Sequence, residues 1–355
     1  MVSTIDRDKA RILVIRFSSL GDLVLMIPML RTLRAGYPSH SLELVTKSKY
    51  ASLFDSLRWI DRVHKLEEDG LGPLLNLAAR LRRDRFELLV DAHDVIRSRI
   101  LSLLLRARKR ARLDKDQIRK TILIRSGRNL YGSPPSMVDR YLRITGGLGL
   151  SASMEGPMLT LPEEIVLSVD RALSGEGFGQ RRLVALAPGA RWPSKRWPWE
   201  NYAELSSRLS EAGFGIVLVG GDEERELCAK VADGSYTALN TAGRMDVPET
   251  AALLARCDCL VTNDSAPLHI AEMSGTPVVA IFGPTVREFG FYPRLDRSVL
   301  IERDCACRPC SRNGAKECRL GTLECLTLTG VDEVFDAVMR VTGSADSAGL
   351  ERGGV

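Results

Sequence analysis

This 355-residue sequence lacks long apolar runs, a signal-peptide pattern and the common nucleic-acid-binding signatures. No apolar run approaches the roughly 20 residues that a membrane-spanning helix needs. Charged residues lead directly into the first apolar segment at residues 11–17, which is not typical of a secretory leader. No RNP, zinc-finger or helix-turn-helix signature is present, so nucleic-acid binding is not the expected function. We therefore expect a soluble cytoplasmic protein.

Standard phosphate and metal motifs are also lacking. There is no GxxxxGK[ST] loop, and no D-x-D stands where it could bridge a metal to a diphosphate. Disulfides are disfavoured without a secretory signal. Five of the eight cysteines lie between residues 305 and 325, and Cys307 and Cys310 have the spacing of a metal knuckle, but the later spacings fit no standard zinc pattern. We expect reduced structural thiols and no metal; the alternative is a structural metal on Cys307, Cys310, Cys318 and Cys325.

The net charge of +5 conceals an asymmetry. Residues 1–160 carry 29 Lys and Arg against 17 Asp and Glu, whereas residues 161–355 carry 21 against 28. Most of the excess lies in residues 97–128, where 12 residues are basic and two are acidic. Such a segment either binds an anionic partner or forms a solvated surface.

Apolar strand-like segments alternate with amphipathic helical ones in both halves of the chain. Residues 11–17 and 183–187 each predict a buried first strand, and Pro and Gly break the pattern near residues 150–165. Residues 93–110 predict a basic helix. The alternation predicts two parallel-sheet domains, 1–155 and 156–342, followed by a disordered tail, 343–355.

Polar residues follow several of the predicted strands, where parallel sheets bind ligands. Asp22 follows the first strand and is either a helix cap or a catalytic base. Lys195 lies in a Gly-containing loop and either neutralises a diphosphate or belongs to an ordinary basic surface. Residues 220–224 either cap a helix or hold ribose hydroxyls. Met245 either fills a core gap or lines an adenine pocket.

The segment 261–285 predicts a strand, a helix and a second strand. Asp264 and Ser265 lie at the helix start, where free N–H groups favour either an ordinary cap or a phosphate. Pro267 suits a first helical turn. His269 follows within the helix and is either structural or a ligand-binding residue.

Taken together, these segments resemble glycosyltransferase family 9, the ADP-heptose:lipopolysaccharide heptosyltransferases, and in particular heptosyltransferase II. The order and combination of the segments carry the resemblance over nearly the whole chain. They are RILVIRFSSLGDLVLMIPMLRTLRAGYP at 11–38, FELLVDAHDVIRS at 86–98, ALAPGARWPSKRWPWENYAEL at 185–205, IVLVGGDEERE at 216–226 and NDSAPLHIAEMSGTPVVAIFGPT at 263–285.

The resemblance implies an α/β fold of the GT-B architecture, with two Rossmann-like parallel-sheet domains facing across a cleft. It implies that Asp22 is the catalytic base. The nucleotide-sugar-binding residues that it implies are Gly189, Ala190, Lys195, Glu224, Met245, Asp264, Ser265, Ala266 and His269. The sequence departs from the family pattern at residues 265–267, where Ser-Ala-Pro stands in place of the common Thr/Ser-Gly.

The implied reaction is metal-independent, inverting transfer of heptose from the donor substrate ADP-heptose to an inner-core lipopolysaccharide acceptor. No cofactor is expected. An anionic acceptor gives the basic segment a role, and we expect Arg97, Arg99, Lys109 and Arg112 to bind it. We expect a monomer, peripherally attached to the cytoplasmic face of the inner membrane. The alternatives are transfer of another sugar, or a nucleotide-sugar epimerase similar to the UDP-GlcNAc 2-epimerases.

Overall fold

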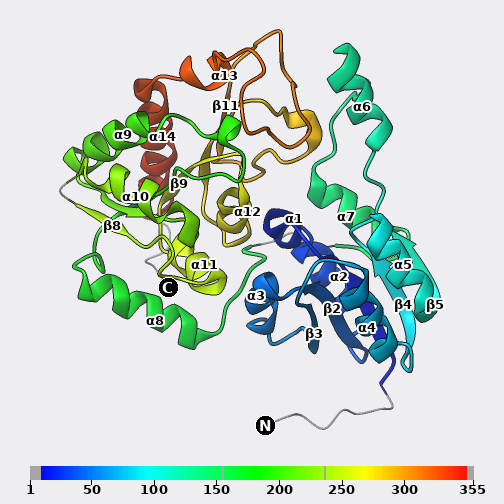
Figure 1. Ribbon diagram of the computed structural model, residues 1–355. Helices are drawn as coiled ribbons and strands as arrows, with labels where there is room; N and C mark the ends of the chain where they lie inside the picture. The colour runs from blue at the N-terminus through cyan, green and yellow to red at the C-terminus, as the bar shows by residue number, and fades with distance from the viewer. Residues whose placement is uncertain (1–8, 153–155, 236, 350–355) are drawn as a thin grey trace. The chain divides into compact units, whose positions relative to one another are not determined.

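The chain folds into two compact units. The computed structural model describes residues 9–152, 156–235 and 237–349, with the side chains of 344–349 left out (Figure 1). Unit 1 comprises Met1–Lys115 and Met137–Glu155, and unit 2 comprises Asp116–Ser136 and Gly156–Val355. Within the described residues, no helix is both long and apolar enough to cross a membrane.

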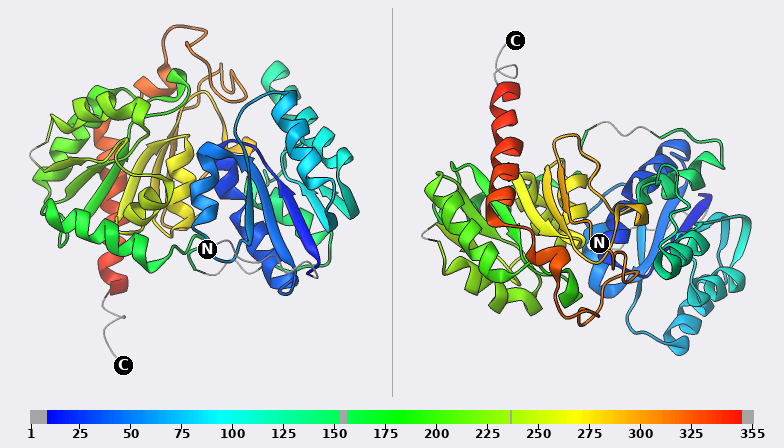
Figure 2. Two further views of the ribbon diagram at one scale, coloured as in Figure 1. Left: turned by 60° about the horizontal axis from the view of Figure 1, so that its bottom comes forward. Right: turned by 90° about the horizontal axis from the view of Figure 1, so that it is seen from above.

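Unit 1 is built on a five-stranded parallel sheet with the order β3-β2-β1-β4-β5. The buried strand β1, predicted from the apolar run, pairs with both β2 and β4. Helices α4 and α5 pack together, as do α2 and α7, and Figure 2 shows helices on both faces of the sheet. The elements are β1 (Arg11–Ile15), α1 (Leu20–Leu25), α2 (Ile27–Gly36), β2 (Ser41–Lys47), η1 (Ser48–Tyr50), α3 (Ala51–Asp55), β3 (Arg62–Leu66), α4 (Leu71–Leu81), β4 (Arg85–Asp91), α5 (Ile96–Leu104), β5 (Arg106–Arg112) and α7 (Met137–Gly146).

Unit 2 is built on a six-stranded parallel sheet with the order β11-β10-β9-β6-β7-β8. Its central strands β6, β9 and β10 are buried along their whole length, which explains why β6 and β10 are apolar throughout and why β9 begins with an apolar run. The elements are α6 (Gln117–Ser126), α8 (Glu163–Gly175), β6 (Leu183–Ala187), η2 (Pro193–Lys195), α9 (Trp199–Glu211), β7 (Gly215–Leu218), η3 (Asp222–Glu224), α10 (Arg225–Ala232), β8 (Ala238–Asn240), α11 (Val247–Ala255), β9 (Cys259–Asn263), α12 (Ala266–Met273), β10 (Val278–Phe282), η4 (Arg287–Phe289), β11 (Val299–Glu302), α13 (Glu324–Thr327) and α14 (Val331–Gly349).

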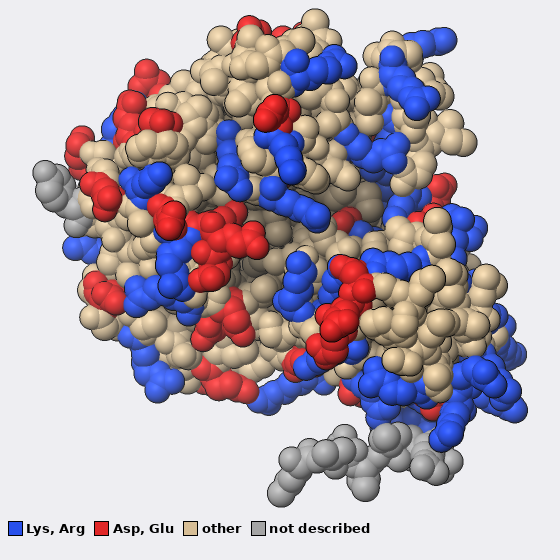
Figure 3. Space-filling view, in the orientation of Figure 1, with Lys and Arg blue, Asp and Glu red and all other residues tan. Residues whose placement is uncertain are grey.

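The predicted basic helix at 93–110 is wrong. The helix α5 ends at Leu104, and the sequence RARKRAR forms the edge strand β5, which pairs in parallel with β4. Lys and Arg favour helices locally, but pairing with β4 overrides that preference. Charged side chains on an edge strand also discourage pairing with another chain. Figure 3 shows basic side chains over this side of unit 1.

The division into units differs from the predicted domains at residues 116–136. The predicted boundary between residues 155 and 156 coincides with a boundary between the units, but 116–136 belongs to unit 2. Its helix α6 places Leu123 in an apolar cluster with Tyr131 and Phe289, and the ammonium of Lys120 lies 5.6 Å from the Phe289 ring centre. These contacts join segments far apart in sequence, which a reading in chain order does not anticipate.

The structure differs from the predicted disordered tail in the first part of that segment. Helix α14 continues to Gly349, whereas residues 350–355 lie outside the described residues. One glycine inside a helix costs only about 1 kcal/mol, and Ala345 and Ala348 favour the helical conformation. The Gly and Ser content of this segment therefore did not end the helix.

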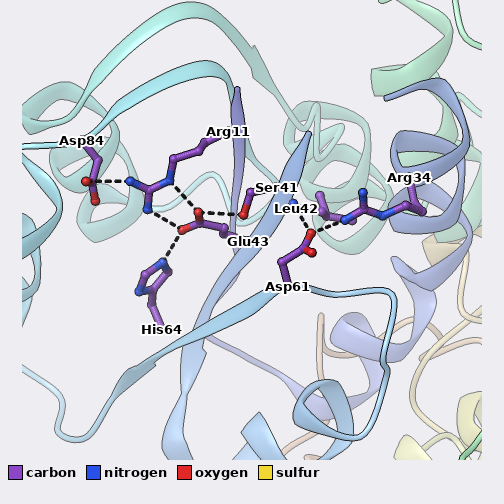
Figure 4. Close-up of polar contacts among 8 residues, drawn as sticks. All are labelled: Arg11, Arg34, Ser41, Leu42, Glu43, Asp61, His64 and Asp84. Carbon is purple, nitrogen blue, oxygen red and sulfur yellow. Dashed lines mark hydrogen bonds and ion pairs between the residues drawn. The ribbon is translucent and has the colours of Figure 1, made fainter. Parts of the chain in front are cut away.

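A buried ionic network joins the first three strands of unit 1 near their amino ends (Figure 4). The Glu43 carboxylate accepts hydrogen bonds from Arg11 Nε at 2.6 Å and Ser41 Oγ at 3.1 Å, and its second oxygen lies 2.6 Å from His64 Nε2. Burial alone would raise the pKa of Glu43, but the bonds from His64 and Arg11 outweigh it and lower the pKa to about 2. Glu43 is therefore a buried carboxylate that the fold keeps ionised.

The network predicts a specific acid sensitivity. Because the pKa of Glu43 is depressed, its contribution is present above pH 4.5 and is lost as the pH falls towards about 2. Glu43→Gln should lower the free energy of unfolding by up to about 3 kcal/mol above that range, and the difference from the wild type should shrink as the pH falls. Urea unfolding at several pH values measures this, with exposed Glu68→Gln as the control. A difference in unfolding free energy between Glu43→Gln and the wild type that stays constant with pH would contradict this prediction.

Candidate functional site

The order of strands creates one crevice at the carboxyl ends of each sheet. In unit 2 the chain runs from β6 outward to β7 and β8, and then returns to the opposite side of β6 as β9. The loops after β6 and β9 therefore diverge from adjacent strands, which is where open parallel sheets bind ligands. In unit 1 the same relation holds for β1 and β4.

An ion pair between a partly buried lysine and a buried aspartate lies at the β6/β9 crevice of unit 2. Lys195 Nζ lies 2.5 Å from Asp264 Oδ2, and Thr285 Oγ1 donates to the same oxygen at 2.6 Å. Burial opposes ionisation of Asp264, but the charge of Lys195 and the two hydrogen bonds outweigh it and hold the pKa of the carboxylate below its usual range. The sequence placed Lys195 and Asp264 in one site, and the structure brings them together.

Asn263 fixes the two loops against each other, a role that no sequence motif predicted. Its Nδ2 donates to the carbonyl oxygens of Pro188 at 2.9 Å and Gly189 at 3.2 Å, and its Oδ1 accepts from the Trp197 backbone N–H at 2.9 Å. Trp197 is itself buried and donates through Nε1 to Thr329. A buried amide at the end of an apolar strand was the available signal, since such groups need partners.

Glu224 faces the glycine loop. Its carboxylate accepts the Gly221 backbone N–H at 2.9 Å. A Cβ added at Gly189 would lie 1.8 Å from Glu224 Oε1, so only glycine permits this approach. The adjacent Ala190 is buried. The structure thus brings the predicted residues Gly189 and Glu224 together. The Glu224 carboxylate can accept hydrogen bonds from hydroxyl groups.

The start of α12 carries the remaining predicted residues of this site. Ser265 is the N-cap with extended backbone, Ala266 is the first helical residue, and Pro267 stands in the first turn as predicted. His269 is buried, and its ring centre lies 5.9 Å from that of Phe291.

Met245 stands apart in the loop between β8 and α11. Its strand β8 is two strands from β6, roughly 10 Å along the sheet.

Asp22 lies at the β1/β4 crevice of unit 1. Its Oδ2 accepts from the Ser19 backbone N–H at 3.4 Å, in a capping box at the start of α1, and from Ser19 Oγ at 2.7 Å. The same oxygen lies 2.9 Å from an Arg16 guanidinium nitrogen. Arg16 is buried, donates to the carbonyl oxygen of Ala92, and stacks 5.6 Å from the Tyr141 ring centre. Asp22 therefore caps the helix and also presents a carboxylate paired with a fixed cation.

His93 was not singled out by the sequence analysis. Its Nδ1 accepts the Phe17 backbone N–H at 3.4 Å, and its ring centre lies 5.4 Å from that of Phe17. Burial, followed by the charges of Arg16 and Lys115, lowers the pKa of His93 to about 3. The imidazole is therefore neutral near pH 7.

The predicted acceptor-binding residues are not all in one place. Arg97 pairs with Asp69 at 2.6 Å and stacks 5.6 Å from the Phe17 ring centre, close to His93. Arg99 and Arg112 both lie near Asp94: Asp94 Oδ1 is 2.8 Å from Arg99 Nη2 and 3.5 Å from Arg112 Nε. Lys109 is exposed on β5, three residues before the strand ends, which is roughly 10 Å along it. Three of the four thus lie near the carboxyl ends of the strands, and Lys109 does not.

All eight cysteines are free thiols, and Cys228, Cys257 and Cys259 lie in the core. Four of the others, together with Ser194, line one cavity of about 60 Å³. Among the described residues, no group of three or more Cys, His, Asp or Glu side chains is arranged to hold a metal ion. The four cysteines of this cavity are Cys307, Cys310, Cys318 and Cys325.

Comparison with known proteins identifies the family. The sequence pattern of glycosyltransferase family 9 (heptosyltransferase) matches residues 74–321. The chain belongs to this family. It is therefore a glycosyltransferase, and the predicted family is confirmed.

This family 9 chain is similar to two lipopolysaccharide heptosyltransferases from bacteria. It is 27% identical over 296 residues to lipopolysaccharide heptosyltransferase 2 of Salmonella typhimurium, covering 79% of this chain and 84% of that protein. It is 25% identical to lipopolysaccharide heptosyltransferase 1 of Pseudomonas aeruginosa, covering 84% and 86%.

Solved structures share the fold. A family 9 glycosyl transferase from Veillonella parvula has a TM-score of 0.79 at 22% identity, covering 96% of this chain and 99% of that one. For E. coli ADP-heptose lps heptosyltransferase II, the TM-score is 0.74 at 23% identity, with 95% and 99% covered. The predicted α/β class, with two Rossmann-like parallel-sheet domains of the GT-B type, is confirmed.

The contact between Gly189 and Glu224 yields a prediction. Gly189→Ala should lower the free energy of unfolding by roughly 0.5–1.5 kcal/mol, because the new methyl group displaces the Glu224 carboxylate and breaks its hydrogen bond with the Gly221 N–H. Gly221→Ala is the matched control, since a Cβ there meets nothing within 4 Å. In a Glu224→Ala background, Gly189→Ala should cause little further loss, because the side chain that the methyl group displaces is absent. Equal stability of the two glycine variants in urea titrations would refute the contact.

Proposed function

We propose that this protein transfers heptose from ADP-heptose to an inner-core lipopolysaccharide acceptor, with inversion at the anomeric carbon. The observation that carries the proposal is the Lys195–Asp264–Thr285 cluster at the β6/β9 crevice, in a chain of family 9. Relatives whose names specify lipopolysaccharide heptosyltransferases 1 and 2 support the sugar and the acceptor class.

Unit 2 is the proposed donor half. Lys195 places a fixed cation beside the start of α12, and both favour an anion such as a diphosphate. Glu224 is proposed to hold the ribose hydroxyls beside Gly189, and Met245 to contact the adenine. Because the positive groups are already in place, they stabilise the charge that develops on the departing diphosphate.

Unit 1 is the proposed acceptor half. Asp22 accepts the proton of the acceptor hydroxyl, whose oxygen forms a bond to the anomeric carbon. The bond from that carbon to the β-phosphate oxygen breaks, and its electron pair leaves with ADP. Arg16, 2.9 Å from Asp22, favours the ionised carboxylate that a base requires.

We propose that the transfer needs no divalent metal and no cofactor, since Lys195 and the α12 start supply the positive charge. We also propose a monomer that contacts the inner membrane surface through the basic side of unit 1. Family membership supports transfer over the epimerase alternative, which needs no macromolecular acceptor.

The test is transfer of heptose from ADP-heptose to a defined inner-core acceptor, with the donor alone incubated in parallel. We expect an acceptor-dependent product with the wild type, and a fall of at least about a hundredfold with Asp22→Asn, the usual size of a general-base effect. Glu87→Gln, at the opposite end of β4, is the control. Epimer formation from the donor alone would support the epimerase, and near-normal turnover of Asp22→Asn would reject the base assignment.

A further inference from the structure

The carboxyl ends of three neighbouring strands in unit 1 place an unassigned lysine beside Asp22. Arg16 and Asp22 follow β1, and His93 follows β4. Beyond β5, the Leu113 backbone N–H donates to the Asp91 carbonyl oxygen at 3.0 Å, which extends the pairing of the two strands. Lys115 comes two residues later, and its carbonyl oxygen accepts from Arg140 at 3.3 Å.

Lys115 differs from the other basic residues near Asp22 in its partners. Arg16 pairs with Asp22, and Arg97 pairs with Asp69. The Lys115 ammonium, which is partly buried, has no hydrogen bond or ion pair to any residue that the structure describes. A partly buried cation without a partner is costly, and an anionic ligand would compensate it.

The electrostatics of Lys115 agree with this position. Burial, followed by the nearby charge of Arg16, lowers the pKa of the ammonium, whereas Asp22, Asp94 and Asp91 act in the opposite direction. The positive charges of Arg16 and Lys115 also contribute to the lowered pKa of His93. Lys115 therefore lies within electrostatic reach of the carboxylate proposed as the base, but it forms no direct ion pair with that carboxylate or with Asp91 or Asp94.

A second polar group near Arg16 lacks a partner. The Tyr141 side chain is fully buried, and its hydroxyl has no hydrogen-bond partner among the described residues. Its ring lies under the Arg16 guanidinium. Buried hydroxyls without partners are rare and call for a water or ligand, so the surroundings of Arg16 contain unmet hydrogen-bonding capacity besides that of Lys115.

We propose that Lys115 binds an anionic group of the acceptor, a carboxylate or a phosphate, and thereby positions the attacked hydroxyl beside Asp22. The inference rests on the proposed function. Lys115 is a positioning residue here, because it holds the acceptor and takes no part in the proton transfer. Its charge-assisted hydrogen bond would lower the acceptor KM and leave the donor site unchanged.

The test compares acceptor kinetics of the wild type, Lys115→Met, Lys115→Arg and Arg108→Ala, the last being an exposed basic residue of β5. Lys115→Met should raise the acceptor KM about tenfold or more, the size expected for one charge-assisted hydrogen bond, with donor KM unchanged. Lys115→Arg should recover part of the loss, because it keeps the charge. Arg108→Ala should match the wild type.

Modified acceptors identify the anion. Each variant is assayed with the intact acceptor, with its carboxylates methyl-esterified and with its phosphates removed. For the wild type, removing the anionic group that Lys115 binds should raise the acceptor KM as much as the Lys115→Met substitution does. For the Lys115→Met variant, the same modification should change the acceptor KM little. Sensitivity to esterification indicates a carboxylate, and sensitivity to dephosphorylation indicates a phosphate.

The outcomes separate this inference from the proposed function. Suppose that the wild type transfers heptose. The role of Lys115 is then refuted if Lys115→Met keeps a normal acceptor KM, or if its KM responds to both acceptor modifications as strongly as that of the wild type. The proposed function stands in either case. If the wild type transfers nothing, the proposed function fails, and binding of the intact and modified acceptors to wild type and Lys115→Met still tests the anion site directly.

Discussion

In both sheets the first strand along the chain lies in the interior of the sheet, and this topology determines where the candidate site residues lie. In unit 2 the chain leaves β6 in one direction and returns as β9 on the other side, and unit 1 does the same with β1 and β4. The paired strands end side by side while their loops diverge, which leaves a crevice lined by backbone N–H groups and loop side chains. Lys195 and Asp264 occupy one crevice, and Asp22 and His93 the other.

The two crevices handle charge differently. In unit 2 the partly buried cation Lys195 is paired with the buried Asp264. Hydrogen bonds from Asn263 and Thr285 fix the surrounding loops. A diphosphate arriving there meets a preorganised cation. In unit 1 one cation is matched and another is not, since Arg16 pairs with Asp22 while Lys115 pairs with no described residue. The unmatched charge suits an acceptor that brings its own anion.

The sequence predicted the elements that follow apolar periodicity and missed those that depend on distant partners. The strands at 11–15, 183–187 and 259–263 each contain an apolar run of three or more residues, and burial on both faces explains why they were recognisable. Strand β5 was mistaken for a helix, because its Arg and Lys residues favour a helix until β4 supplies hydrogen bonds.

The same distinction applies to the sites. Lys195, Asp264 and Glu224 came from short segments that resemble a family. The roles of Arg16, Lys115 and Asn263 were missed, because they arise only where the ends of several strands meet.

The most direct test of the account is calorimetric titration of ADP into the wild type, Lys195→Ala, Asp22→Asn and Lys230→Ala. Lys230 is an exposed lysine of α10 and serves as the control. The account predicts that Lys195→Ala weakens ADP binding by about tenfold or more, the size of one lost charge-assisted contact, while Asp22→Asn and Lys230→Ala bind as the wild type does. Unchanged affinity in folded Lys195→Ala, or lost affinity in Asp22→Asn, would contradict the assignment of the donor to the β6/β9 crevice.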